Sequence, residues 1–432
     1  VSHSSLEVLI LYCTFVQPIS TIETQTVGLD CERIHNVSTS LTGYWSTATG
    51  CKLLGNWWKP QISAHSARRN AWRIAGSHLC YDLAGSSSST SGGRCSGGTG
   101  WESCARLCQR ARWTRAALKA GKHVLCEKPF TANAEEAREV QDLARSRGLV
   151  CREAFHYREH PLMEHLRALL GSPALGVSSG SPGCQEASGG VLGRLRSVDV
   201  AVLIPKWVFG GTNIRFQESL AGGAAMDAGC YCLHAIRSLV GGQPVVESAA
   251  AVMAAKSQVV DAAMSGTLQW LEGSNTGLRA SFRASLQHDG PLPVSTIDVR
   301  GERGHLHCSN FIMPVFGNVV RLTTTAAASE TSNAKGSGNA VSTSVNRVYG
   351  SGESTYYYQL SRFVRDVCRV KDASKDGDEG ALVMASTILL DDAADSIASM
   401  HLVDEVYVAA GLTPRLPSAK AATIQPVDPA IQ

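Results

Sequence analysis

The sequence predicts an α/β protein with two domains, a doubly wound parallel sheet followed by an α/β domain that has a large, mostly antiparallel sheet. Its 432 residues are enough for two domains of ordinary size. Helix and strand patterns alternate over 113–154, whereas short strand patterns follow one another after residue 245 without long helices between them. We therefore divide the chain into a first domain, 1–153, and a second domain, 154–432.

Residues 1–110 are the atypical part of the first domain. They show little sustained period of 2 or 3.6 residues, and they contain a Ser/Gly tract at 85–100. No Gly-x-Gly-x-x-Gly sequence follows a strand pattern there, although such a loop normally opens a dinucleotide-binding sheet. Because the pattern changes abruptly at Ala111, we hypothesise that 1–110 is the product of a retained intron or an out-of-frame exon.

The segment that follows predicts a helix, a buried strand, a second helix and a second strand. The helix over 113–120 leads to the apolar run 123–126. Asn133, with a glutamate three residues later, caps the second helix, and 149–154 is the next strand. Since the connection is a helix, the two strands should be parallel and lie in one sheet.

The second domain opens with a helix over 162–170 and a Gly/Ser/Pro-rich surface loop over 171–193. Strands are expected at 245–251, 265–271, 277–286, 295–299 and 319–323. A polar loop over 326–344 precedes two helices, 356–370 and 392–410. We expect these helices to cover one face of the antiparallel sheet.

The composition favours a soluble globular protein that acts on small molecules. A formal net charge of +3, with no basic run, gives no strong field to attract nucleic acid or an anionic membrane. The apolar run 8–16 is too short to span a bilayer, and no basic residues precede it that would indicate a signal peptide. The chain begins with Val1 rather than Met, which suggests that the natural amino terminus is missing.

The 14 cysteines do not predict a metal site. Their spacing is irregular, and the pair Cys104 and Cys108 lacks a second pair at the spacing of a zinc site. We therefore expect reduced thiols in a cytoplasmic protein that holds no metal.

Two segments carry residues suited to chemistry. The first is GKHVLCEKP at 121–129, in which Lys128 follows a buried parallel strand. Ligands of open α/β sheets bind at the carboxyl ends of such strands. Pro129 restricts Lys128 to an extended backbone, so we expect the lysine to point into a crevice. Taken alone, however, a Glu-Lys-Pro tripeptide is more often a solvated turn.

The second segment is GGAAMDAGCYCLHAIR at 222–237, which predicts a single helix with glycines at both ends. Asp227, Tyr231 and His234 are spaced i, i+4 and i+7, so they share one stripe beside an apolar face. The alternative interpretation is structural: a buried tyrosine and histidine whose hydrogen bonds are satisfied locally.

Together the two segments resemble the Gfo/Idh/MocA oxidoreductase family, in which an AGKHVLCEKP-type strand end is followed about a hundred residues later by GGxxxDxGxYxxxxxR. The resemblance continues through EAFHYREHP at 153–161 and ends at AAGL at 409–412, so it covers roughly 300 residues. The most similar branch contains glucose-fructose oxidoreductase, D-xylose dehydrogenase and dimeric dihydrodiol dehydrogenase. That branch has tyrosine rather than histidine at the position of Tyr231.

The resemblance implies a Rossmann-type first domain and an NADP cofactor, with NAD as the alternative. Hydride would pass between the nicotinamide and a sugar or trans-dihydrodiol, as in D-xylose 1-dehydrogenase or trans-1,2-dihydrobenzene-1,2-diol dehydrogenase. Lys128 and Tyr231 would be the catalytic pair. A phenol has a pKa of about 10, and a nearby lysine ammonium favours its ionised form, so the pair can share acid-base work.

The resemblance also implies which residues bind ligands. Glu127, Lys128 and Pro129 would contact the cofactor, and Asp227 would orient Lys128 or Tyr231. The candidates for the substrate pocket are Asp227, His156, Tyr157, Arg158 and His234. A homodimer is also expected, because a broad antiparallel sheet often pairs with a copy of itself.

The sequence departs from the family at two points. It lacks the glycine-rich loop, and Arg110 stands where the family usually has a histidine, shortly before the helix that leads to the lysine. An alternative function therefore stays open: a catalytically inactive, family-derived binding or scaffolding protein without a cofactor loop.

Overall fold

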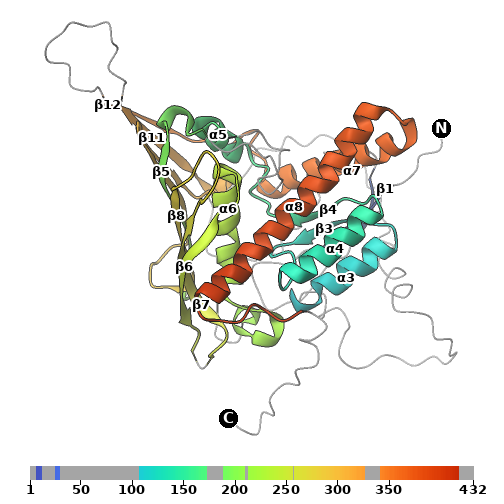
Figure 1. The fold of residues 1–432 in the computed structure, drawn as a ribbon, viewed down its shortest axis with the longest axis horizontal. Coiled ribbons are helices and arrows are strands. Elements are labelled where there is room, and N and C mark those ends of the chain that lie inside the picture. Colours follow the sequence, from blue (N-terminus) through green and yellow to red (C-terminus); the bar gives the residue numbers. More distant parts are fainter. Residues whose placement is uncertain are drawn as a thin grey trace, which may run out of the picture.

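The structure is a computed structural model that describes residues 6–11, 25–29, 107–172, 188–209, 213–255, 257–325 and 341–417. Over these ranges the chain forms a four-stranded sheet and an eight-stranded sheet. Helices α6 and α8 lie between the two sheets, and α8 runs diagonally from one to the other (Figure 1). The described part is therefore an α/β protein, as the sequence predicted.

The small sheet has the strand order β2-β1-β3-β4. Its strands and helices are β1 (Leu6–Leu11), β2 (Gln25–Leu29), α3 (Leu107–Lys119), β3 (His123–Glu127), α4 (Ala134–Ser146) and β4 (Cys151–Ala154). Strand β3 is parallel to β1 and to β4, and β2 is antiparallel to β1. The predicted strand-helix-strand unit is confirmed, with its cap at Asn133, whose side chain accepts a hydrogen bond from the backbone N–H of Glu136 at 3.0 Å.

Strands β1 and β2 are a difference from the sequence analysis, which assigned no strand before residue 123. Strand β1 lies directly beside β3, with Val8 opposite His123 and Leu11 opposite Cys126. A mostly apolar run of six residues does not by itself distinguish a strand from other apolar segments. A strand is defined by its pairing with a neighbour, and the run alone does not reveal that neighbour. The predicted Ser/Gly tract at 85–100 lies outside the described residues.

The large sheet has the strand order β12-β11-β10-β9-β5-β8-β7-β6. Its strands are β5 (Leu195–Pro205), β6 (Val245–Met253), β7 (Asp261–Gln269), β8 (Arg279–His288), β9 (Val294–Gly301), β10 (Gly304–Ser309), β11 (Val319–Thr325) and β12 (Val341–Asn346). Strands β5 and β8 are parallel, and every other neighbouring pair is antiparallel. The prediction of a mostly antiparallel sheet is confirmed.

Three strands of this sheet were missed by the sequence analysis. Strands β5 and β10 were not assigned, and β12 lies where the polar loop over 326–344 was predicted. All six side chains of β12 are exposed, so its sequence lacks the alternation that marks a half-buried strand. The rest of that predicted loop, 326–340, lies outside the described residues, as does 173–187 of the loop predicted over 171–193.

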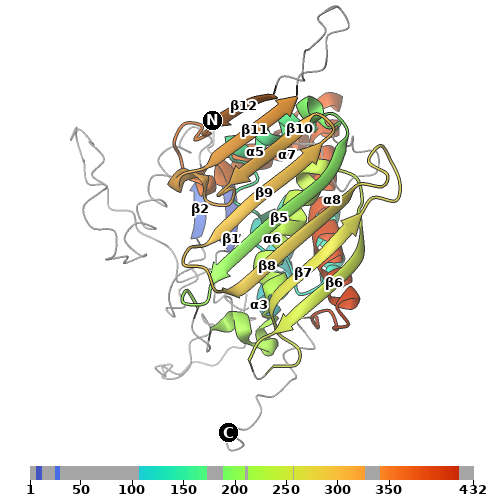
Figure 2. The same ribbon diagram turned by 90° about the vertical axis from the view of Figure 1, so that its left-hand side faces the viewer.

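The remaining helices are α5 (Pro161–Leu170), α6 (Cys230–Val240), α7 (Thr355–Asp376) and α8 (Glu379–Ala409). Short helical turns are formed by Gly190–Leu192, Ile214–Phe216, Glu218–Leu220, Ala225–Gly229 and Pro314–Phe316. Figure 2 shows the large sheet face-on, with α6, α7 and α8 behind it. No helix in the described part of the chain is long and apolar enough to cross a membrane.

The expectation that the last two helices cover the large sheet is wrong for α7. Its apolar side chains, among them Phe363 and Val367, pack with the first half of α8 against Leu125 and Val150 of the small-sheet domain. Only α8 reaches the large sheet, where it contacts β6. An amphipathic pattern identifies the apolar face of a helix but not the sheet that this face will cover.

Of the cysteines whose side chains the structure describes, all but one agree with the expectation of reduced thiols. Five buried cysteines carry free thiols in the structure: Cys126, Cys151, Cys230, Cys232 and Cys308. Cys368 of α7, in contrast, is disulfide-bonded, so the expectation of reduced thiols is wrong for this residue. Within the described ranges, no group of His, Cys, Asp or Glu side chains is arranged to hold a metal ion.

Candidate active site

Lys128 lies at the carboxyl end of β3, and the peptide bond between Lys128 and Pro129 is cis. Arg110 of α3 fixes this turn: its Nη1 donates to the carbonyl oxygens of Lys128 at 2.7 Å and Pro129 at 2.8 Å, and more weakly to that of Glu127 at 3.4 Å. One buried guanidinium thus satisfies three consecutive carbonyls. The backbone that carries Lys128 is held by contacts that do not involve its own side chain.

The side chain of Lys128 is paired with Asp227. Its Nζ donates to the backbone carbonyl of Asp227 at 2.8 Å and lies 2.9 Å from Oδ1 of the same residue, while Nε of Arg215 donates to Oδ2 at 2.7 Å. Burial by itself would raise the pKa of Asp227, but the charges of Arg215 and Lys128 hold it well below its usual range. Asp227 is therefore an ionised carboxylate that joins two cations.

A π-helical turn places Asp227 in that position. The sequence predicted one regular helix over 222–237, whereas the structure has a π turn at Ala225–Gly229 before α6 begins at Cys230. Single π turns are rare and occur preferentially at functional sites. This turn presents both the carbonyl and the carboxylate of Asp227 to Lys128, and heptad spacing alone could not predict it.

Tyr231 lies against the same lysine. Lys128 Nζ is 4.6 Å from the centroid of the Tyr231 ring, within the range of a cation–π contact, and Tyr231 is 3% exposed. Burial, followed by neighbouring ionisable groups, raises the pKa of Tyr231 well above its usual value. The phenol is therefore neutral at neutral pH in this structure. Lys128 is itself 4% exposed, and its contacts include Asp227 and the ring of Tyr231.

His156 is the candidate substrate residue that contacts the hydroxyl of Tyr231. Its Nε2 lies 3.3 Å from Tyr231 Oη, its Nδ1 lies 2.9 Å from Oγ1 of Thr355, and its ring stacks on Tyr356 with centroids 4.4 Å apart. Burial and the charge of Lys128 lower the pKa of His156 to about 3. The imidazole is therefore neutral over the physiological range.

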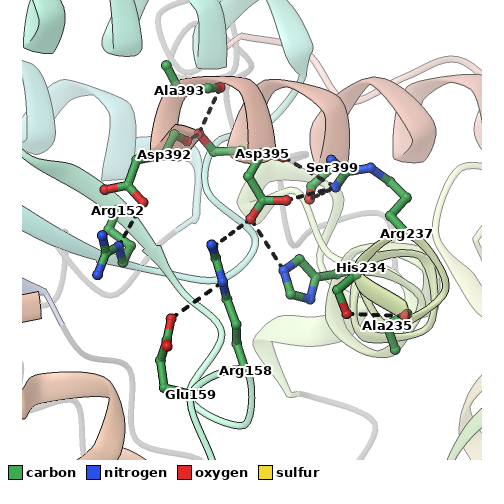
Figure 3. A network of polar contacts seen from close by, with 12 residues as sticks. Arg152, Arg158, Glu159, His234, Ala235, Arg237, Asp392, Ala393, Asp395 and Ser399 are labelled. Carbon is green, nitrogen blue, oxygen red and sulfur yellow. Dashed lines mark hydrogen bonds and ion pairs between the residues drawn. The ribbon is translucent and has the colours of Figure 1, made fainter. Parts of the chain in front are cut away.

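Of the other three candidate substrate residues, Arg158 and His234 lie in an adjacent network around Asp395 of α8 (Figure 3), and Tyr157 reaches this network through His234. Tyr157 Oη is 2.6 Å from His234 Nδ1, and His234 Nε2 is 3.3 Å from Asp395 Oδ2. Arg158 pairs with that same oxygen at 2.7 Å, and Arg237 pairs with Oδ1 at 3.1 Å. Arg158 and His234 thus contact Asp395, and Tyr157 contacts His234, whereas Asp227 and His156 contact the Lys128–Tyr231 pair.

Phe155 connects the two groups of side chains. Its ring stacks on His234 with centroids 4.0 Å apart and meets Tyr231 edge-on at 5.5 Å. Tyr157 also packs against Tyr231, with ring centroids 5.7 Å apart. The position of the phenol is therefore determined by rings that are themselves held by the Asp395 network.

Two buried glutamates support the strand ends. Glu127 Oε2 accepts from the backbone N–H of Lys128 at 3.0 Å, and Glu153 Oε1 accepts from that of Phe130 at 2.9 Å. Burial raises the pKa of Glu127 to about 7 and that of Glu153 to about 8. Glu127 therefore contacts the turn around Lys128 through its side chain, in a position at the edge where cofactors of this fold bind.

Sequence reasoning missed Arg215 and gave Asp395 no role. Neither residue belongs to a motif with a fixed spacing to Lys128 or Tyr231, and both reach the site through contacts between distant segments. Arg110 was noted only as a replacement for a histidine. Its three carbonyl contacts could not be inferred from that position.

Comparison with known proteins assigns the class of this fold. Residues 104–155 match the family model described as "Oxidoreductase family, NAD-binding Rossmann fold", and residues 186–307 match "GFO/IDH/MocA C-terminal domain". The fold and these matches define an α/β protein with a Rossmann-like domain and a second domain built on a large sheet. The two matched segments are thus similar to the Gfo/Idh/MocA oxidoreductase family, which is also the family that the two sequence motifs resemble.

Curated relatives are similar over part of their length. A D-xylose 1-dehydrogenase (NADP(+)) of Haloferax volcanii is 36% identical over 174 residues, which are 40% of this chain and 46% of the relative. The trans-1,2-dihydrobenzene-1,2-diol dehydrogenase of Sus scrofa is 35% identical over 191 residues, 43% of this chain and 48% of the relative. The chain therefore spans about half the length of these relatives.

Solved structures share the fold. The aldose-aldose oxidoreductase from Caulobacter crescentus complexed with glycerol has a TM-score of 0.50 and 17% identity, over 72% of this chain and 77% of that chain. An oxidoreductase domain protein from Kribbella flavida also has a TM-score of 0.50 and 17% identity, over 71% of this chain and 77% of that chain. At this identity the likeness establishes the arrangement of helices and strands.

Proposed function

We propose that this chain is an NAD(P)-dependent dehydrogenase that transfers hydride between a nicotinamide cofactor and a CH–OH group of a sugar or trans-dihydrodiol. The observation that carries the proposal is the contact between Lys128 and Tyr231, which come from the two segments that match the family models. The names of the relatives, a D-xylose dehydrogenase and a dihydrodiol dehydrogenase, support this substrate class. NADP is the preferred cofactor, because it is in the name of the xylose dehydrogenase.

The described residues fit the nicotinamide end of such a cofactor. Lys128 supplies a buried cation at the carboxyl end of a parallel strand, where dinucleotides bind in this class of fold. We propose that Glu127, Lys128 and Pro129 hold that end, and that the domain boundary lies after residue 153. When bound, the nicotinamide supplies the acceptor or donor of hydride.

The residues of the chain then account for the proton. During oxidation Tyr231 would take the proton of the substrate hydroxyl on Oη, and during reduction it would return one. The ammonium of Lys128 favours the ionised phenol, and Asp227 holds the ammonium in place. Of the other substrate candidates, His156 contacts Tyr231 directly, whereas Tyr157, Arg158 and His234 would act by fixing the wall of the pocket.

The partners and location follow from the same proposal. The substrate is a small molecule, and we propose a cytoplasmic protein that binds neither nucleic acid nor membrane. A homodimer is proposed because the described helices leave one face of the large sheet uncovered (Figure 2).

The first experiment is titration of the purified chain with NADPH and NADH, followed by fluorescence, beside a Lys128→Ala variant. Lys206→Ala is the matched control, since Lys206 is an exposed lysine paired with Asp289. We expect NADPH to bind and Lys128→Ala to weaken binding about tenfold or more, the cost of one charge-assisted hydrogen bond, with Lys206→Ala unchanged. Assays with D-xylose, D-glucose and trans-dihydrodiols would then identify the substrate.

The second candidate function is a family-derived binding or scaffolding protein without catalysis. It is favoured by one observation, the lack of a Gly-x-Gly-x-x-Gly loop after a predicted strand. A folded chain that binds neither NADPH nor NADH would establish this candidate and refute the dehydrogenase.

A further inference from the structure

Tyr231 has a polar neighbour besides the charged group of Lys128. His156 Nε2 lies 3.3 Å from Tyr231 Oη, and His156 Nδ1 lies 2.9 Å from Thr355 Oγ1. Tyr231 and His156 are each 3% exposed and Thr355 is 1% exposed. The three side chains form a buried chain of polar contacts that runs from α6, through the segment after β4, to the first residue of α7.

The surroundings of His156 determine its charge. The charged and titratable groups that face it are Lys128 at the end of β3, Tyr231 on α6 and Tyr356 on α7. Burial, and after it the charge of Lys128, lower the pKa of His156 to about 3. A neutral imidazole has one N–H donor and one acceptor nitrogen, so the chain of contacts can run in only two directions.

The start of α7 favours one of these directions. Thr355 is the first residue of this 22-residue helix, and Ser354 is its N-cap. The amino-terminal end of a helix carries a partial positive charge, which favours a lone pair over an N–H group on the nitrogen that faces it. That nitrogen is Nδ1, so the proton of the imidazole belongs on Nε2 and faces Tyr231.

We propose that Thr355 donates its hydroxyl proton to His156 Nδ1, so that His156 donates its Nε2–H to Tyr231 Oη and favours the phenolate. This inference rests on the proposed role of Tyr231 as the group that takes up and returns a proton. A donor to the charged form of an acid stabilises that form, and hydrogen bonds to ions are stronger than those between neutral groups. It also leaves the hydrogen of the Tyr231 hydroxyl directed at the substrate rather than at the imidazole.

His156 is in this view a positioning residue that acts through Tyr231. Lys128 faces the ring of the phenol at 4.6 Å, whereas His156 faces its oxygen. The two groups therefore favour the same ionised state from different sides. The histidine contributes a directed donor, and its neutrality avoids a second positive charge beside the lysine.

The test compares two substitutions at one position. His156→Leu removes the donor, whereas His156→Gln keeps an N–H that can reach Tyr231 Oη. In the oxidation direction we expect His156→Leu to lower kcat at pH 7 about tenfold, to change KM less than about twofold, and to move the rising, acidic limb of the pH profile of kcat upward by about one unit, because one pKa unit corresponds to a factor of ten. His156→Gln should recover most of kcat.

Thr355→Val tests the tautomer of His156 without replacing His156 itself. Thr387→Val on α8 is the matched control, since Thr387 is an exposed threonine that bonds only to the backbone of its own helix among the described contacts. Histidine-selective ¹⁵N NMR, with His156→Leu to assign the signals, should find the proton on Nε2 in the unsubstituted protein. Thr355→Val should shift protons to Nδ1, and Thr387→Val should not.

Two outcomes would overturn the inference: the proton on Nδ1 in the unsubstituted protein, or a His156→Leu variant with unchanged kcat and pH profile. Thermal unfolding of each variant separates these outcomes from a loss of folding, and His156→Gln keeps the test available if His156→Leu is unstable. Failure of the proposed function is distinguishable, because a chain without dehydrogenase activity still gives the NMR result for the tautomer.

Discussion

At the scale of single residues, the main feature of the site is that two cations share the carboxylate of Asp227. Asp227 binds Lys128 through one oxygen and Arg215 through the other, so two cations surround one anion. The remaining positive charge suits a reaction in which negative charge develops on a substrate oxygen, as it does when a hydroxyl loses its proton. The motifs predicted Lys128 and Asp227, but the second cation, Arg215, was found only from the structure.

Glu153 gives a prediction about stability and pH. Its pKa is raised by burial from 4.5 to about 8, and its Oε2 has no hydrogen-bond partner among the described residues, so an ionised oxygen would be buried there without a donor. A raised pKa in the folded state gives stability that is fully present below pH 4.5 and is lost as pH rises to about 8, because the unfolded state releases its proton first.

We therefore expect Glu153→Gln to become more stable relative to the unsubstituted chain as pH rises through this window, by about 3–5 kcal/mol in the free energy of unfolding. Urea unfolding at several pH values between 4.5 and 8 measures it. Glu139→Gln, at an exposed position, is the control. If the free energy of unfolding had the same pH dependence in the unsubstituted chain and in Glu153→Gln, Glu153 would be ionised in the folded state.

At the scale of elements, α8 is the helix that the site depends on most. It supplies Asp395 to Arg158, His234 and Arg237, and Asp392 to Arg152 of β4 (Figure 3). Burial alone would raise the pKa of Asp395, but Arg158 and the other partners hold it well below its usual value. The contribution of Asp395 to the stability of the fold is therefore present above the ordinary pKa of an aspartate, and it is lost as pH falls below that value.

Asp395→Asn should lower the free energy of unfolding by about 3–5 kcal/mol, because it leaves the guanidinium groups of Arg158 and Arg237 buried without their carboxylate. Urea unfolding at pH 7 measures this loss, which should shrink as pH approaches 3. Asp142→Asn, an exposed aspartate that pairs with Arg145, is the control. A loss below about 1 kcal/mol, the range of surface pairs, would contradict the assignment.

At the scale of the whole molecule, the two sheets are joined through shared helices. Helix α8 contacts α4, α7 and β4 on the side of the small sheet, and α6 and β6 on the side of the large sheet (Figure 1). Buried ion pairs join α8 to both sides, through Arg152 of β4 and through Arg237 of α6. The domain boundary proposed after residue 153 therefore divides the sequence without separating two independent cores.

This arrangement predicts a single cooperative unfolding transition for the described part of the chain. Tryptophan fluorescence, to which the buried Trp270 beside the large sheet contributes, and far-ultraviolet circular dichroism should give the same midpoint in urea. The Asp395→Asn variant should shift both midpoints together. Two separated transitions would mean that the sheets unfold independently.

The fold class, the strand-helix-strand unit around Asn133, the mostly antiparallel second sheet and the motifs of Lys128 and Tyr231 could all be predicted from the amino-acid sequence. These features depend on local periodicity, capping and short spacings, which a single sequence contains. Two other features became visible in the structure alone: a π turn places Asp227, and α7 packs on the side of the small sheet. The structure also shows that Asp395 contacts Arg158, His234 and Arg237, which the sequence could not indicate because such contacts join segments that no local pattern relates.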